Sequence, residues 1–201
     1  MALARTHPTW ALAWEDEGWW SRLAQPALHT WRSDHDPLRL QERTLPCAER
    51  MPKALACYGV LVRHVPTQPA HMLLRFGERR PVSRETTAFL AWCSERWAAQ
   101  GLTAVLLIWD NASWHISREG RTWLRQHNHH VKQTGQGVRI LTCRLPSTSP
   151  WLNPIEPKWV HGKRAIVEPD RLRSAQEIVE RVYAYYGCGE EVHQVISEKA
   201  A

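Results

Sequence analysis

Residues 106–115 read LLIWDNASWH, from Leu106 to His115, and this stretch decides the fold. It completes a nearly unbroken apolar run that begins at Leu102. Such a run is typical of a strand in a parallel sheet that is covered on both faces. The run leads directly into Asp110. We therefore expect a buried parallel strand from Leu102 to Trp109 with a carboxylate at its carboxyl end.

Strand patterns fill the first third of the chain, and helices then alternate with strands. The expected strands are Thr9 to Glu17, Ala27 to Ser33, Lys53 to His64, Ala70 to Phe76, Leu102 to Trp109 and Val138 to Leu145. The first of these is expected to carry its acidic residues at its end. Apolar residues at helical spacing predict helices at 86–97, with Ser83 as N-cap and Gly101 past the end, from about Ser117, from about Pro154, and from Ser174 to Tyr186. This order predicts an α/β fold, a mixed sheet flanked by helices.

Length and composition predict one soluble domain. The chain has 201 residues, 43% of them hydrophobic and 23% charged, which excludes a wholly disordered chain. The longest apolar run is too short to cross a bilayer, and residues 1–7 show no apolar leader. The five cysteines are odd in number and contain no C-x-x-C pair, which favours a reducing, cytoplasmic setting.

Positive charge is concentrated in one part of the chain. The net charge is +6, yet Arg118 to Arg173 alone holds eleven Lys and Arg against four Asp and Glu. An anionic partner is therefore expected, and DNA phosphates are candidates. The candidate backbone contacts are Arg118, Arg121, Arg125, Lys158, Lys163 and Arg164. For these side chains a merely solvated basic face remains an open alternative.

A second informative segment is LPSTSPWLNPIEPKW, from Leu145 to Trp159. Asn153 is expected to cap a helix, with Pro154 at its first position and Glu156 in its first turn. Pro157 lacks the N–H that a fourth helical residue would use, which predicts either a later helix start or a distorted helix. Strand ends that carry Asp16 and Asp110 are expected to meet at one edge of the sheet.

Together the two segments resemble mariner-related bacterial insertion-sequence transposases, whose catalytic domains belong to the ribonuclease-H-like DDE superfamily of nucleotidyltransferases. The resemblance runs from about Trp10 to Ile166. It implies a ribonuclease-H-like fold, with Asp16, Asp110 and Glu156 as the carboxylates that hold two Mg²⁺ or Mn²⁺ ions. Glu15 and Glu17 remain alternatives to Asp16. Asn111, His115 and Asn153 are candidates to support these ligands or to contact DNA.

The resemblance also implies metal-dependent DNA strand cleavage and strand transfer. The expected partners are the DNA of element ends and target, and further copies of the chain bound on DNA, with no membrane partner. We expect one DDE catalytic domain over 1–201, with a core at about 9–166 and C-terminal helices at about 171–198. The N-terminal helix-turn-helix region that relatives carry is expected to be absent. The alternatives are a catalytically inactive fragment that binds DNA or partner transposase as a modulator, and a junction resolvase on the same fold.

Overall fold

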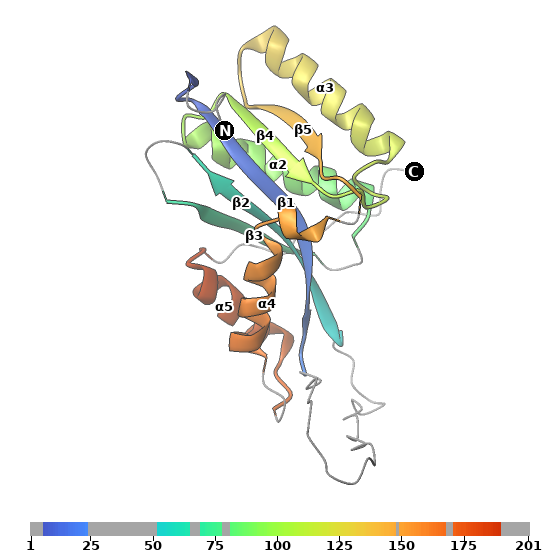
Figure 1. Ribbon diagram of the computed structural model, residues 1–201, viewed down its shortest axis with the longest axis vertical. Helices are drawn as coiled ribbons and strands as arrows, with labels where there is room; N and C mark the ends of the chain where they lie inside the picture. The colour runs from blue at the N-terminus through green and yellow to red at the C-terminus, as the bar shows by residue number, and fades with distance from the viewer. Residues whose placement is uncertain are drawn as a thin grey trace.

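The expected mixed sheet is present in the computed structural model, and β1 (Trp10–Ser21) lies at its centre (Figure 1). The structure describes residues 6–23, 52–64, 69–77, 81–147, 149–167 and 171–189. Five strands lie in the order β3-β2-β1-β4-β5. The other strands are β2 (Ala54–Arg63), β3 (His71–Gly77), β4 (Ala104–Trp109) and β5 (Arg139–Arg144). The expected strand at 27–33 lies outside the described residues.

The strand directions divide the sheet into two parts. β1, β2 and β3 form an antiparallel meander, whereas β4 and β5 run parallel to β1. β4 has buried residues on both faces, as its apolar sequence predicts. β1 pairs with β4 only over Trp10 to Trp14 and continues beyond that point against β2. The acidic residues of β1 therefore lie inside the strand, where the parallel pairing stops, and not at the strand end as expected.

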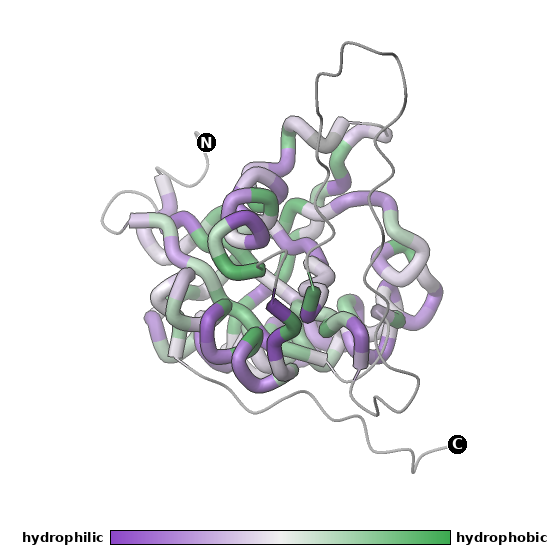
Figure 2. The backbone as a smooth tube through the Cα atoms, turned by 90° about the horizontal axis from the view of Figure 1, so that it is seen from below, coloured by the Kyte–Doolittle hydropathy of each residue, from purple (hydrophilic) through white to green (hydrophobic). Residues whose placement is uncertain are grey.

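Two pairs of helices cover the two faces of the sheet. Side chains of α2 (Ser83–Ala99) and α3 (Arg118–Thr134) share one apolar cluster with odd-numbered residues of β1 such as Ala13. Side chains of α4 (Glu156–Ile166) and α5 (Ala175–Tyr186) share the other cluster with even-numbered residues such as Trp20. Figure 2 shows hydrophobic stretches toward the middle of the molecule, with hydrophilic stretches mostly around them. A 3₁₀ turn, η1 (Pro150–Leu152), precedes α4.

Most of the expected helix ends are confirmed. The Ser117 hydroxyl caps α3 by accepting a hydrogen bond from the Gly120 N–H at 2.9 Å. Ser174 and Glu177 form a reciprocal capping box at the start of α5. Ser83, however, is the first residue of α2, and Val82 holds the N-cap position without a side-chain cap.

The start of α4 differs from the expectation in a way that accommodates Pro157. The helix begins at Glu156 and not at Pro154. Pro157 is thus the second helical residue, where a backbone N–H has no partner inside the helix, so the proline costs no hydrogen bond. The later start that the sequence suggested is confirmed.

Within the described part of the chain, no helix is both long enough and apolar enough to cross a membrane. The four cysteines within it, Cys57, Cys93, Cys143 and Cys188, are free thiols. Beyond α5 the described residues end at 189, so the expected helix up to 198 is not covered.

Candidate active site

Strand register brings Asp16 beside Asp110. In the parallel pair, Trp14 of β1 lies opposite Ile108 of β4. Two residues further along each strand, the same register places Asp16 level with Asp110, at the point where β4 ends. Because side chains alternate across a strand, Asp16 shares the sheet face of Trp14 and Trp20, which is the face covered by α4 and α5.

Helix α4 brings Glu156 toward Asp16, because Trp159 of the same helix contacts the Asp16 carboxylate. The indole N–H of Trp159 donates a hydrogen bond to Asp16 Oδ2 at 3.2 Å. The ring lies on two glycines of the sheet, since a Cβ at Gly59 would come within 2.5 Å of it and one at Gly18 within 3.2 Å. Glu156 precedes Trp159 by three residues, so both lie on one face of α4, one turn apart.

A pocket of about 410 Å³ opens where these elements meet. Asp110, Asn111, Asn153 and Glu156 all line it, together with residues of the segment that follows β5. Asn111 donates a hydrogen bond from Nδ2 to the Leu145 carbonyl at 2.8 Å and so ties the end of β4 to the end of β5. Asn153 accepts a hydrogen bond from the Ile155 N–H at 3.4 Å and shapes the turn before α4.

Negative charge accumulates on the α4 side of the sheet. Burial raises the pKa of Asp16 to about 7, and the nearby carboxylates of Glu156, Glu17 and Asp110 add to this effect. Hard carboxylate oxygens in such a group are the ligands that Mg²⁺ and Mn²⁺ prefer. By ligand chemistry Asp16, Asp110 and Glu156 fit divalent cations, which would relieve the repulsion that adds to the raised pKa of Asp16. Within the described residues, however, the group whose ligand atoms already lie within 4.8 Å of one another is Glu15, Glu17 and His115.

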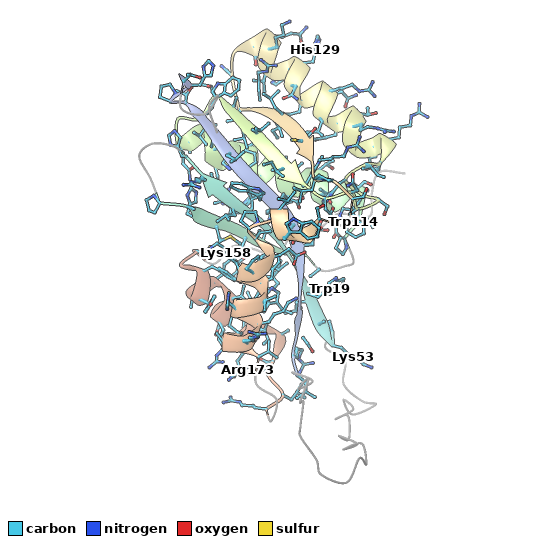
Figure 3. The ribbon with its side chains drawn as sticks, in the orientation of Figure 1. Trp19, Lys53, Trp114, His129, Lys158 and Arg173 are labelled. Atoms are coloured by element: carbon cyan, nitrogen blue, oxygen red, sulfur yellow. The ribbon has the colours of Figure 1, made fainter. Side chains whose placement is uncertain are left out.

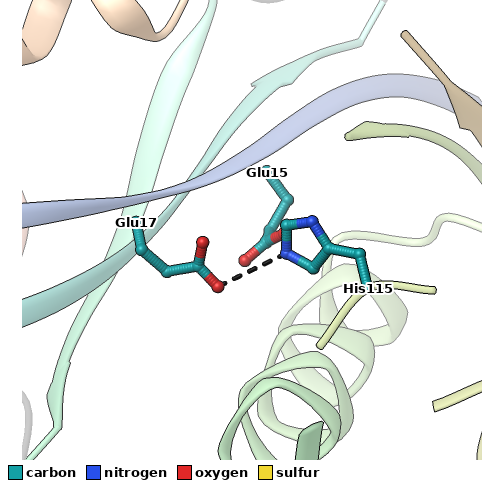
Figure 4. A group of neighbouring side chains, drawn as sticks. All are labelled: Glu15, Glu17 and His115. Atoms are coloured by element: carbon teal, nitrogen blue, oxygen red, sulfur yellow. Dashed lines mark ion pairs between the residues drawn. The ribbon is translucent and has the colours of Figure 1, made fainter. Parts of the chain in front are cut away.

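His115 contacts Asp110 from the α2 side of the sheet, opposite to the face that α4 covers. Its Nδ1 is 2.7 Å from Asp110 Oδ1, and its Nε2 is 2.9 Å from Glu15 Oε2 and 3.3 Å from Glu17 Oε1. Figure 4 shows Glu15 and Glu17 converging on this imidazole. The ring also stacks on Trp109, with 4.7 Å between the ring centroids.

The charge on His115 balances these acids. Burial opposes the protonated imidazole, but the surrounding carboxylates, Glu15 foremost, raise its pKa to about 12. In return, the hydrogen bond from His115 holds the pKa of Asp110 below its usual range, against the effect of partial burial. Glu15, Glu17 and His115 each offer one ligand atom, a carboxylate oxygen or a ring nitrogen, and these three atoms lie within 4.8 Å of one another. This spacing could also hold a metal ion.

Strand alternation separates the three acids of β1. Glu15 and Glu17 point to the α2 side and pair with His115, whereas Asp16 points to the α4 side and meets Trp159. Asp16 is therefore the acid of this group that shares a face with Glu156. Trp159 itself was not singled out from the sequence. A glycine inside a strand signals close approach of another group, so Gly18 and Gly59 could have indicated a packed ring.

The basic candidates lie elsewhere. Arg118, Arg121 and Arg125 line a second pocket, between α3 and β5. Lys158, Lys163 and Arg164 lie on α4, and Figure 3 shows Lys158 on that helix, far from His129 on α3. Among the described residues, none of these six side chains lines the pocket of Asp110 and Glu156.

Two of three comparisons with known proteins find similarity to this chain. A family model described as "DDE superfamily endonuclease" matches residues 78–179, a span that includes Asp110 and Glu156 but not Asp16. No curated protein matches the chain.

Among solved structures, similarity is found to a Mos1 transposase paired-end complex with left transposon end, with a TM-score of 0.59 and 15% identity over 89% of this chain and 48% of that one. A Mos1 mariner paired end complex with Mn gives a TM-score of 0.58 and 14% identity over 89% of this chain and 48% of that one. At such identities the likeness establishes the fold, which is similar to the ribonuclease-H-like fold of those transposases. The chain spans about half the length of these structures.

Proposed function

Because the chain belongs to the DDE superfamily endonucleases, we propose that it is a transposase catalytic domain that cleaves DNA strands and transfers them with Asp16, Asp110 and Glu156. One observation carries the proposal. The hydrogen bond of Trp159 fixes α4 against Asp16, while Glu156, one turn earlier, faces the pocket that Asp110 also lines.

The three carboxylates are proposed to hold two Mg²⁺ or Mn²⁺ ions. Their oxygen donors and the repulsion between Asp16 and the carboxylates around it support this assignment. When bound, a pair of such cations supplies Lewis-acid stabilisation of the attacking and leaving oxygens of the phosphodiester.

Neighbouring groups hold two of these carboxylates, Asp110 and Asp16, in place. His115 donates to Asp110 Oδ1 and holds that carboxyl ionised. Trp159 fixes one oxygen of Asp16, and the Glu17 N–H donates to the other at 2.9 Å. Asn111 and Asn153 are proposed to hold the pocket walls at a constant separation, since each bonds to backbone at its rim.

DNA is the proposed substrate, both as element ends and as target, with several copies of the chain assembled on it. The similar Mos1 structures include a paired-end complex with a transposon end, which supports this proposal. Lys158, Lys163 and Arg164 are proposed to contact the DNA backbone from α4. An origin in a mariner-related bacterial insertion sequence remains a prediction.

The test is nicking of supercoiled plasmid DNA with Mg²⁺ or Mn²⁺ by the wild type, Asp110→Asn and Glu156→Gln. Glu119→Gln, which alters an exposed acid of α3 outside the pocket, is the matched control. We expect metal-dependent nicking by the wild type and the control only. Equal nicking by all four proteins would contradict the proposal. DNA binding without nicking by any of them would favour the inactive modulator instead.

A further inference from the structure

A second, larger pocket of about 860 Å³ lies between α3 and β5. We call it the basic groove. One wall is the α3 face with Arg118, Arg121, Leu124, Arg125 and Asn128, and the other is Ile140 to Thr142 of β5. None of these lining residues is acidic. We propose that the basic groove holds the phosphodiester backbone of the DNA strand that leads into the catalytic pocket.

No acidic side chain within the described residues neutralises the three arginines. Arg125 donates from Nε to the Arg121 carbonyl and from a terminal nitrogen to Thr122 Oγ1, both at 3.3 Å, so its side chain lies along the helix. Within the described ranges, neither Arg118, Arg121 nor Arg125 forms an ion pair with a carboxylate. The planar guanidinium group matches phosphate oxygens in geometry and charge, which makes phosphate the fitting ligand.

The walls of the basic groove are fixed before any ligand arrives. Asn128 accepts a hydrogen bond from the Ile140 N–H and donates one to the Ile140 carbonyl, both at 2.8 Å. His127 Nε2 lies 2.9 Å from the Val138 carbonyl, and the ring stacks on Trp123 with 5.0 Å between centroids. His127 and Asn128 therefore fix α3 against the edge strand of the sheet.

The hydrogen bonds between Asn128 and Ile140 argue against a protein strand as the occupant of the basic groove. β5 is the edge strand, and a strand from another chain would need the outward backbone groups of Ile140. Asn128 already occupies both groups. Sheet extension is thus blocked at Ile140, which favours an occupant recognised through the arginine side chains.

Spacing and position favour a nucleic acid backbone over a single small anion. Arg118 and Arg125 are seven residues apart, about 10 Å along a helix axis, which corresponds to roughly three phosphate intervals of one strand measured along the DNA axis. The same two chain segments, the one before α3 and the one after β5, border both the groove and the catalytic pocket. Asn111 and Leu145 line that pocket, and each lies a few residues from the groove, before α3 and after β5 respectively. The proposal rests on the proposed function, because it takes DNA as the substrate.

The test measures DNA binding without metal, so that it does not depend on cleavage. A fluorescent 30-base-pair duplex is titrated in EDTA at several salt concentrations against the wild type and the double variant Arg121→Ala/Arg125→Ala. The control is Arg139→Ala, an exposed arginine of β5 outside the groove. The slope of log K, where K is the association constant, against log salt concentration is negative. We expect the double variant to have a slope that is less steep by about 0.9 for each lost phosphate contact. The control should keep the wild-type slope. Circular dichroism establishes that each variant is folded.

The proposal is overturned if the control loses as much of the salt slope as the double variant, or if the slope of the double variant is unchanged. One form of the second result is an unchanged slope together with an altered oligomeric state of the double variant without DNA. That form would make the basic groove an interface between copies of the chain. The outcome is separable from the proposed function. Weaker binding by the double variant with a wild type that does not cleave supports the groove alone, and cleavage with an unchanged slope supports the catalytic assignment alone.

Discussion

Trp159 of α4 and Asp16 of β1 are joined by a hydrogen bond of 3.2 Å from the indole N–H to Oδ2, although they lie 143 residues apart in the chain. The indole ring is 2% exposed and lies on Gly59, the residue directly opposite Asp16 on β2. This contact sets the position of α4, and therefore of Glu156, relative to the carboxylate of β1.

Gly59→Ala is expected to displace Trp159. A Cβ at this position would come within 2.5 Å of the ring and 3.1 Å of Leu74, so overpacking should lower the free energy of unfolding by about 1–3 kcal/mol. Urea denaturation measures this loss, and DNA nicking by the folded variant should fall as well because Glu156 moves with α4. Gly189→Ala, at a described glycine with open space around it, is the control. Full nicking activity in Gly59→Ala would show that the position of Trp159 does not matter.

The raised pKa of Asp16 predicts a pH dependence of stability without metal. The folded protein holds this proton up to about pH 7, whereas the unfolded chain releases it near the usual value of 3.8. The stabilisation is complete below the lower value and is lost as the pH rises through about 7. The wild type should therefore lose stability relative to Asp16→Asn between pH 4 and 8, as measured by urea denaturation in EDTA. A difference that stays constant over this range would contradict the assignment.

Several elements were predictable because their signals are local. The apolar run before Asp110 gave a buried strand, and the polar residues Ser117 and Ser174 gave helix starts. These features depend on alternation, spacing and capping, which neighbouring residues determine. Ser83 shows the weakness of the same reasoning, since a capping residue type lies one position inside the helix.

The geometry of the site depends on contacts between distant segments. The sequence alone left Glu15, Asp16 and Glu17 as alternatives, because their order does not say which face of β1 meets α4. Pairing with β2 and β4 decides the face, and Asp16 is the acid that lies on the face of Trp159. The ion pairs of His115 with both glutamates likewise required the fold.

Removal of His115 should leave a buried charge without a partner. His115→Ala is expected to cost about 3–5 kcal/mol of unfolding free energy, because Glu15 is fully buried beside it. Adding Glu15→Gln should recover part of this loss, since the amide carries no charge. A double-mutant cycle by urea denaturation measures the coupling. Strictly additive losses would show that the Glu15–His115 ion pair contributes nothing.

We propose that Asp16, Asp110 and Glu156 act together as one set of metal ligands. Calorimetric titration with Mn²⁺ compares the wild type with Asp16→Asn, Asp110→Asn, Glu156→Gln and the control Glu119→Gln. We expect each of the three site variants to bind Mn²⁺ at least about tenfold more weakly, while the control binds as the wild type does. Wild-type Mn²⁺ affinity in all three site variants would show that these carboxylates are not the metal ligands.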